Sequence, residues 1–152
     1  MIYEDADDLV NEQRVAMRVA QAWQLQKLVK PKGFGIDRVA YRSKDDRVPC
    51  CSFEIRCRSK RFKSLLVDQY KLYKIKQIDM MGVPAFFVVE WGGVIQYCRP
   101  ALWEWKGRQP VGFRCEAFQR SARHNQLDVN LCVFIPAELL TDIEVQPEFR
   151  CA

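Results

Sequence analysis

The spacing of apolar residues predicts a helix and then a strand hairpin in the first third of the chain. Within residues 7 to about 28, apolar positions recur at helical spacing and form one buried stripe, made of Leu9, Ala16, Val19 and Trp23. Strands are predicted over residues 35–42 and 51–58, with the polar segment 43–47 as the loop that joins them. The N-terminal part therefore combines one amphipathic helix with two adjacent strands.

The middle of the chain combines a further helix with a buried strand. The helix is predicted over residues 64–81, with Ser64 as its N-cap and Gly82 and Pro84 beyond its end. Residues 83–91 form a continuous apolar run that contains aromatic residues, as is typical of a central strand buried on both faces.

Regular patterning is sparser in the last third of the chain. Strands are predicted over residues 94–98 and 131–135, and a short helix over 137–141. Residues 100–127 are aromatic and basic without a clear period. The order of elements predicts an α/β fold in which helices flank a mixed central sheet.

The length of the chain predicts one domain over residues 1–152, because no repeat or linker divides it. We expect a core over about residues 7–99, and an accessory loop, strand and short helix over residues 100–152. No apolar run reaches the roughly 20 residues that span a bilayer, so we expect no membrane association.

The cysteines and the N-terminus predict a cytoplasmic protein, in the host cytoplasm if the chain is viral. The seven cysteines are irregularly spaced, and with His124 as the single histidine they do not suggest a zinc site. Cys57 and Cys132 lie in apolar alternations and are predicted to be small core residues. The acidic N-terminus has no apolar core of the kind that secretory signals carry.

Positive charge is concentrated in one stretch of the chain, although the net charge is only +5. Eight basic residues, opposed only by Asp68, occupy it: Arg56, Arg58, Lys60, Arg61, Lys63, Lys71, Lys74 and Lys76. Such a stretch suits a polyanionic partner, and it is equally compatible with a solvated helix and loop.

Two carboxylates and a cation form the most informative pattern in the sequence. Asp37 opens the first predicted strand, and Glu54-Ile55-Arg56 follows after a gap of sixteen residues. Because side chains alternate along a strand, Glu54 and Arg56 share one face. Carboxylates and a cation at the ends of adjacent strands are typical of a divalent-metal phosphodiesterase site. Glu12 lies on the apolar stripe of the first helix and needs a partner.

On these residues the chain resembles the PD-(D/E)XK nuclease superfamily, which has the restriction-endonuclease-like fold. The resemblance covers most of the first hundred residues and continues through the second helix and the apolar strand that follows. It is similar in particular to small nuclease-like proteins of phages and to Holliday-junction resolvases. The resemblance implies a metal-dependent DNA endonuclease acting on duplex or branched DNA, as a monomer or a homodimer.

The resemblance also implies a role for each site residue. Asp37, Glu54 and the backbone carbonyl of Ile55 would hold Mg²⁺ or Mn²⁺, and Glu12 would hold a metal-bound water or a second ion. Arg56 stands where the superfamily usually has Lys, which orients the attacking water and stabilises charge on the phosphate. Nucleic-acid contacts would come from the basic residues nearby, Arg58, Lys60, Arg61, Lys71 and Lys74.

Each of these residues also has a purely structural interpretation. Asp37 could accept bonds from backbone amides, and Glu54 could pair across strands with Arg38 or Arg42. Glu12 could pair with Arg56 or Lys71.

Two further alternatives concern Arg56 and the aromatic residues. Arg56 cannot give up a proton, so the chain could instead bind nucleic acid or a host protein without cutting. Trp103 and Trp105, beside Lys106 and Arg108, could stack on bases or pack in the core.

Overall fold

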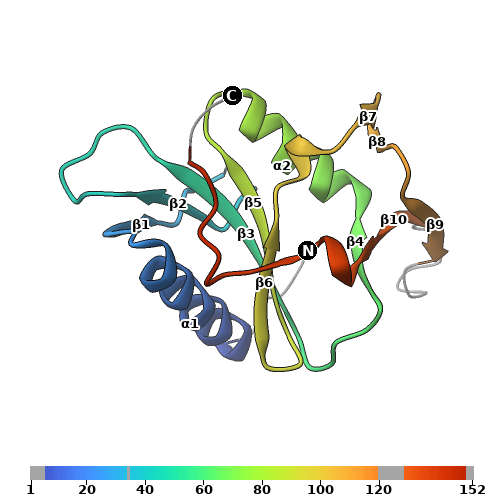
Figure 1. Ribbon diagram of the computed structural model, residues 1–152, viewed down its shortest axis with the longest axis horizontal. Helices are drawn as coiled ribbons and strands as arrows, with labels where there is room; N and C mark the ends of the chain where they lie inside the picture. The colour runs from blue at the N-terminus through green and yellow to red at the C-terminus, as the bar shows by residue number, and fades with distance from the viewer. Residues whose placement is uncertain (1–5, 34, 120–128, 150–152) are drawn as a thin grey trace.

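A mixed six-stranded sheet forms the centre of the protein in a computed structural model that describes residues 6–33, 35–119 and 129–149 (Figure 1). Its strands, in spatial order, are β1 (Lys27–Val29), β2 (Arg38–Tyr41), β3 (Cys51–Arg58), β5 (Ala85–Trp91), β6 (Val94–Cys98) and β11 (Thr141–Asp142). β3 and β5 pair in parallel, and the other neighbours pair antiparallel. The mixed central sheet flanked by helices is therefore confirmed.

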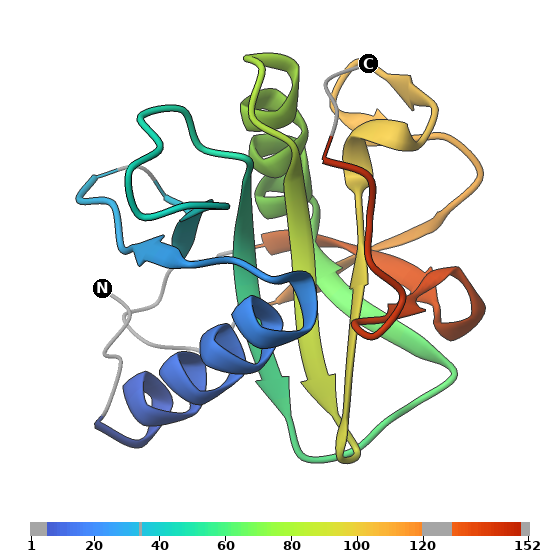
Figure 2. The ribbon, with the colours of Figure 1, turned by 60° about the vertical axis from the view of Figure 1, so that its left-hand side comes forward.

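Helices cover both faces of this sheet (Figure 2). One face packs against α1 (Ala6–Trp23). The other packs against α2 (Gln69–Met80) and a three-stranded sheet of β4 (Ser64–Asp68), β10 (Val129–Pro136) and β9 (Arg114–Gln119). Because β5 is covered on both sides, its sequence is a nearly continuous apolar run. No helix in the described ranges is long and apolar enough to span a bilayer.

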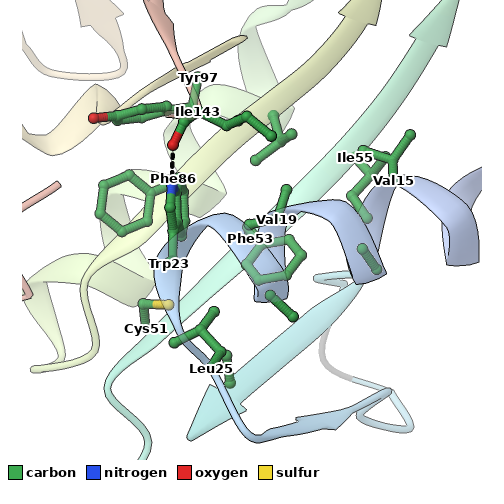
Figure 3. Close-up of a cluster of buried hydrophobic side chains, with 14 of the residues drawn as sticks. Val15, Val19, Trp23, Leu25, Cys51, Phe53, Ile55, Phe86, Tyr97 and Ile143 are labelled. Carbon is green, nitrogen blue, oxygen red and sulfur yellow. Dashed lines mark hydrogen bonds between the residues drawn. The ribbon is translucent and has the colours of Figure 1, made fainter. Parts of the chain in front are cut away.

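Aromatic packing fixes α1 on its face of the sheet (Figure 3). The Trp23 ring meets Phe53, Phe86 and Tyr97 edge-on, and its Nε1 donates to the Ile143 carbonyl at 2.9 Å. Edge-to-face pairs of this kind add to the energy of burial. The segment around Ile143 is thus held against α1 by a hydrogen bond from the buried Trp23 indole.

The predicted first helix ends too late, and one residue of its predicted buried stripe is exposed. α1 stops at Trp23, because Gln24 adopts a left-handed conformation with φ of 56°, and residues 27–29 form strand β1 instead. Leu9 is 42% exposed, whereas Val15 lies fully buried on the inner face. The other predicted stripe residues, Ala16, Val19 and Trp23, are buried as predicted.

The segment predicted as the start of the second helix is a strand. Residues 64–68 form β4, whose register with β10 pairs Leu66 with Phe134. The helix begins only at Gln69, where the Asp68 carboxylate accepts the Tyr70 N–H at 2.8 Å and caps it. Asp68, not Ser64, is therefore the N-cap, since side-chain oxygens at this position satisfy a free helical N–H.

The last third holds more structure than its sequence predicts. Between the predicted strands lie a 3₁₀ turn (Pro100–Leu102), the hairpin of β7 (Trp105–Lys106) and β8 (Gln109–Pro110), and β9. The strand predicted over 131–135 lies within β10. The short helix predicted over 137–141 is a single 3₁₀ turn (Ala137–Leu139) followed by β11. His124 falls outside the described residues.

No disulfide joins the cysteines that the structure describes. Cys57 and Cys132, predicted as core residues, are only half-buried. Trp103 and Trp105 stack with ring centroids 6.3 Å apart and pack against the hydrophobic core on the α2 side of the central sheet. Their contacts favour the packing interpretation over base stacking.

Candidate active site

Asp37 lies directly before β2 and reaches across to β3. Its Oδ2 accepts the backbone N–H of Ile55 at 2.7 Å. The β2–β3 pairing ends at Arg38 and Phe53, so this N–H has no strand partner from β2. The N–H and C=O of one strand residue face the same edge, so the Ile55 carbonyl points toward the same side as Asp37. A carboxylate and a peptide oxygen thus meet at one open sheet edge.

Glu54 lies on the α2 face of β3 and is only 6% exposed. Its Oε1 accepts the Nζ of Lys71 from α2 at 2.7 Å. The partner is therefore neither Arg38 nor Arg42, because Arg38 points to the α1 face and Arg42 lies exposed beyond the end of β2. A buried carboxylate needs such a cation to offset its desolvation.

Asp37 and Glu54 are close enough to affect each other's charge. The pKa of Asp37 is raised from its ordinary 3.8 to about 7, first by burial and then by repulsion from Glu54. The Ile55 hydrogen bond and the charge of Lys71 act in the opposite direction without cancelling the rise. A carboxylate whose ionisation is unfavourable, with a second carboxylate beside it, favours the binding of a cation between them.

Glu12 is buried, as its position on the helix stripe predicts, but its partner differs from the predicted ones. Its Oε1 lies 2.5 Å from Arg38 Nη1 and 3.6 Å from Lys30 Nζ. Arg38 also donates to the Asp37 carbonyl at 2.7 Å and to Gln13 at 2.9 Å. This buried ion pair joins α1 to the strand that carries Asp37.

We expect Glu12→Gln to lower stability by about 1 to 2 kcal/mol, because it weakens a buried ion pair while keeping a hydrogen-bond acceptor for Arg38. Thermal unfolding measures this loss, and calorimetric Mg²⁺ binding serves as the second readout. An unchanged Mg²⁺ affinity is expected, since Glu12 is already neutralised. A large drop in affinity would contradict the structural role and restore Glu12 as a metal ligand.

Two pockets open onto this carboxylate pair. One, of about 250 Å³, is lined from α1 by Asn11 and Glu12 and from β3 by Glu54 and Arg56. The other, of about 350 Å³, is lined by Asp37, Glu54 and Arg56 and, from α2, by Lys74. Arg56 lines both and makes no ion pair or hydrogen bond with any residue that the structure describes. Arg56 therefore lines the same two pockets as the carboxylate pair.

The donor set fits a hard divalent cation better than zinc. Over residues 6–33, 35–119 and 129–149, no group of three or more His, Cys, Asp and Glu residues is arranged to hold a metal. Asp37, Glu54 and the Ile55 carbonyl provide oxygen donors only. Mg²⁺ needs few protein oxygens because it keeps several waters, so these three residues fit Mg²⁺ or Mn²⁺. Glu12 does not join them while it is paired with Arg38.

The other basic residues predicted to contact nucleic acid lie on β3, on the loop after it and on α2. Arg58, Lys60 and Arg61 are exposed at the end of β3 and in the loop that follows. The Arg61 guanidinium lies over the Trp91 ring, 5.8 Å from its centroid. Lys74 lies over the Tyr70 ring at 4.9 Å and lines the pocket beside Glu54. Of the basic residues predicted to contact nucleic acid, Arg58, Lys71 and Lys74 line the pockets at the carboxylates.

Sequence reasoning missed two residues that shape the site. The sequence suggests Arg38 only as a partner for Glu54. Arg38 and the buried Ala40 are two residues apart on β2, so they share the α1 face, where Arg38 lies opposite Glu12. Asp68 was counted only as an opposing charge, yet it caps α2 and lines the pocket beside Glu54. The strand alternation indicates the first, and a helix start placed after Asp68 would have indicated the second.

No family model and no curated protein matches this chain. Among solved structures, it is similar to Hjc of Archaeoglobus fulgidus, a Holliday junction resolvase from an archaeal hyperthermophile. The match has a TM-score of 0.54 at 12% sequence identity and covers 88% of this chain and 87% of the resolvase. The likeness shows a shared fold, consistent with the predicted restriction-endonuclease-like class.

Proposed function

We propose that this protein is a metal-dependent DNA endonuclease of the PD-(D/E)XK type. The observation that carries the proposal is the pairing of Asp37 with Glu54 beside the Ile55 carbonyl, in a pocket that Arg56 also lines without pairing with any described residue. The fold shared with a Holliday junction resolvase supports it, because that protein acts on DNA junctions.

Each side chain has a distinct task in this proposal. Asp37, Glu54 and the Ile55 carbonyl would hold Mg²⁺ or Mn²⁺. Such an ion supplies charge neutralisation at the phosphate and makes water more acidic. Arg56 would bind the scissile phosphate, to which its planar guanidinium is well matched. Lys71 orients Glu54 through the 2.7 Å contact.

The test is a cleavage assay of the purified protein on duplex, single-stranded and four-way branched DNA. We expect strand breaks with Mg²⁺ or Mn²⁺ and none with EDTA. A folded, monodisperse protein that cuts none of these substrates with either metal would refute the proposal.

Arg56 also supports a second candidate, a nuclease-fold protein that binds nucleic acid or a host protein without cutting. Arg stays protonated at any ordinary pH and cannot act as a general base, so a mechanism that needs a proton acceptor at this position would fail. Binding would then be independent of metal and weaken steeply with salt if the partner is nucleic acid. Binding that hardly changes with salt would indicate a protein partner instead.

Variants of Arg56 separate the two candidates. We expect Arg56→Lys to retain cleavage within about tenfold, and Arg56→Met to lose roughly 100-fold, since one preorganised charge at the phosphate is removed. Single-turnover rates on the best substrate measure both. If Arg56→Lys creates activity where the parent protein has none, the non-cutting candidate is supported. If Arg56→Met cuts as fast as the parent, Arg56 has no role at the phosphate.

A further inference from the structure

A groove of about 430 Å³ runs beside the candidate active site, between the end of β3 and the three-stranded sheet. Buried apolar side chains, including Phe87 and Trp91, form its floor. Its rim is formed by residues from β3, the β3–β4 loop and the small sheet: Arg56, Arg58, Phe62, Leu66, Phe118 and Asn130. The size is within the range of roughly 300–1,000 Å³ that is usual for ligand sites.

The groove is continuous with the carboxylate pair. Arg56 lines the groove and both pockets at Asp37 and Glu54, and Asp68 lines the groove and one of them. A nucleic-acid strand with one phosphate bound at Arg56 can therefore place the adjacent nucleotide in the groove.

Two exposed aromatic rings stand at the rim. Phe62 is 64% exposed and Phe118 is 38% exposed. Phe118 is supported from behind by the Phe134 ring, 6.1 Å away. Single exposed apolar residues are common on protein surfaces, but two rings that line one groove form a contiguous apolar site. Aromatic side chains in such positions stack on the faces of unpaired bases.

The charges around these rings are complementary to a nucleotide. Arg56 and Arg58 line the groove, and Phe62 lies between Arg61 and Lys63 in the sequence. Among the described residues that line the groove, Asp68 is the one acidic side chain, and its carboxylate caps the Tyr70 N–H. An apolar interior with cations at its rim suits a ligand that has an apolar base and an anionic phosphate.

We infer that this groove binds an unstacked base of a single-stranded DNA segment next to the scissile phosphate. The inference rests on the proposed nuclease function and names its substrate class, DNA with unpaired nucleotides at the cut, as in a flap, a gap or a branch point. A paired base in a duplex cannot enter, because its faces are covered by its neighbours and its edge by its partner.

Binding without metal tests the groove apart from cleavage. The probes are a fluorescent oligothymidine and a blunt duplex hairpin of equal length, titrated in EDTA by anisotropy. We expect Phe62→Ala to weaken oligothymidine binding on the order of tenfold and hairpin binding less than twofold. Phe62→Trp should restore the oligothymidine affinity. Leu102→Ala is the matched control, because Leu102 is 70% exposed outside the groove and the site.

The outcomes distinguish the groove from the catalytic proposal. Loss of oligothymidine binding alone supports the groove, even if no substrate is ever cut. Equal loss for both probes, or no loss for either, overturns the groove even if the protein is an active nuclease. A parent protein that binds the hairpin as tightly as oligothymidine also overturns it. Unfolding temperatures of all variants confirm that they are folded.

Discussion

Glu54→Gln and Asp37→Asn are each expected to reduce metal-dependent cleavage by roughly 100- to 1000-fold or more, because each removes one of the two charges that hold the cation. Both substitutions preserve shape. The amide oxygen of Asn can still accept the Ile55 N–H, and the amide of Gln still fits beside Lys71. Loss of activity in a folded variant would therefore report the missing charge and not a collapsed site.

The measurement is the single-turnover rate on the best DNA substrate, with Mg²⁺ or Mn²⁺ at several concentrations. Glu138→Gln is the matched control, since Glu138 is an exposed carboxylate in the 3₁₀ turn before β11. Its rate should equal that of the parent protein. If Asp37→Asn and Glu54→Gln also cut at the parental rate, the activity comes from another site and the assignment is wrong.

The sequence was most informative where one short segment determines its own geometry. β3 was predicted with its observed bounds because its residues alternate strictly, and this alternation places Glu54 and Arg56 on one face. The approach of Asp37 to Glu54 follows from the hairpin, since a strand pair joined by one loop must lie side by side. These two facts suffice to locate the carboxylate pair.

The partners of the carboxylates could not be derived in the same way. Glu12 and Glu54 exchange the partners that were predicted for them, because each pairing is decided by which sheet face a helix covers. Glu12 meets Arg38 across the α1 face, and Glu54 meets Lys71 across the α2 face. The periodic spacing of apolar residues shows that a helix or strand has a buried face. It does not show which other element packs against that face.

The predicted start of α2 was wrong for a related reason. Residues 64–68 have apolar positions that fit either a helix or a short strand, and a run of this length does not separate the two. The deciding contact is with β10, whose Val133 pairs with Val67 from far along the chain. Such a non-local pairing leaves no local signal. It nevertheless matters for function, because it places Asp68 and the groove beside the site.

Asp37→Asn is also expected to stabilise the metal-free protein at about pH 8, by roughly 2 kcal/mol or several degrees in unfolding temperature. The folded protein raises the pKa of Asp37 from 3.8 to about 7, mainly through burial and through Glu54. A carboxyl group whose pKa is raised on folding stabilises the folded state below its unfolded pKa, and this contribution is lost as the pH rises through the folded pKa. Above about pH 7 the parent protein holds an unfavourable charge that Asn lacks.

Thermal unfolding in EDTA between about pH 4 and pH 8 measures the effect. The advantage of Asp37→Asn should be full near pH 8, shrink steadily below pH 7 and vanish near pH 4. Millimolar Mg²⁺ or Mn²⁺ at pH 8 should stabilise the parent protein and narrow the difference, because a bound cation relieves the repulsion between Asp37 and Glu54. Asp142→Asn is the control, as an aspartate on β11 outside the carboxylate pockets. A gain that is equal at every pH, or a metal effect that is equal in both proteins, would contradict a strained carboxylate pair and with it the case for a cation site.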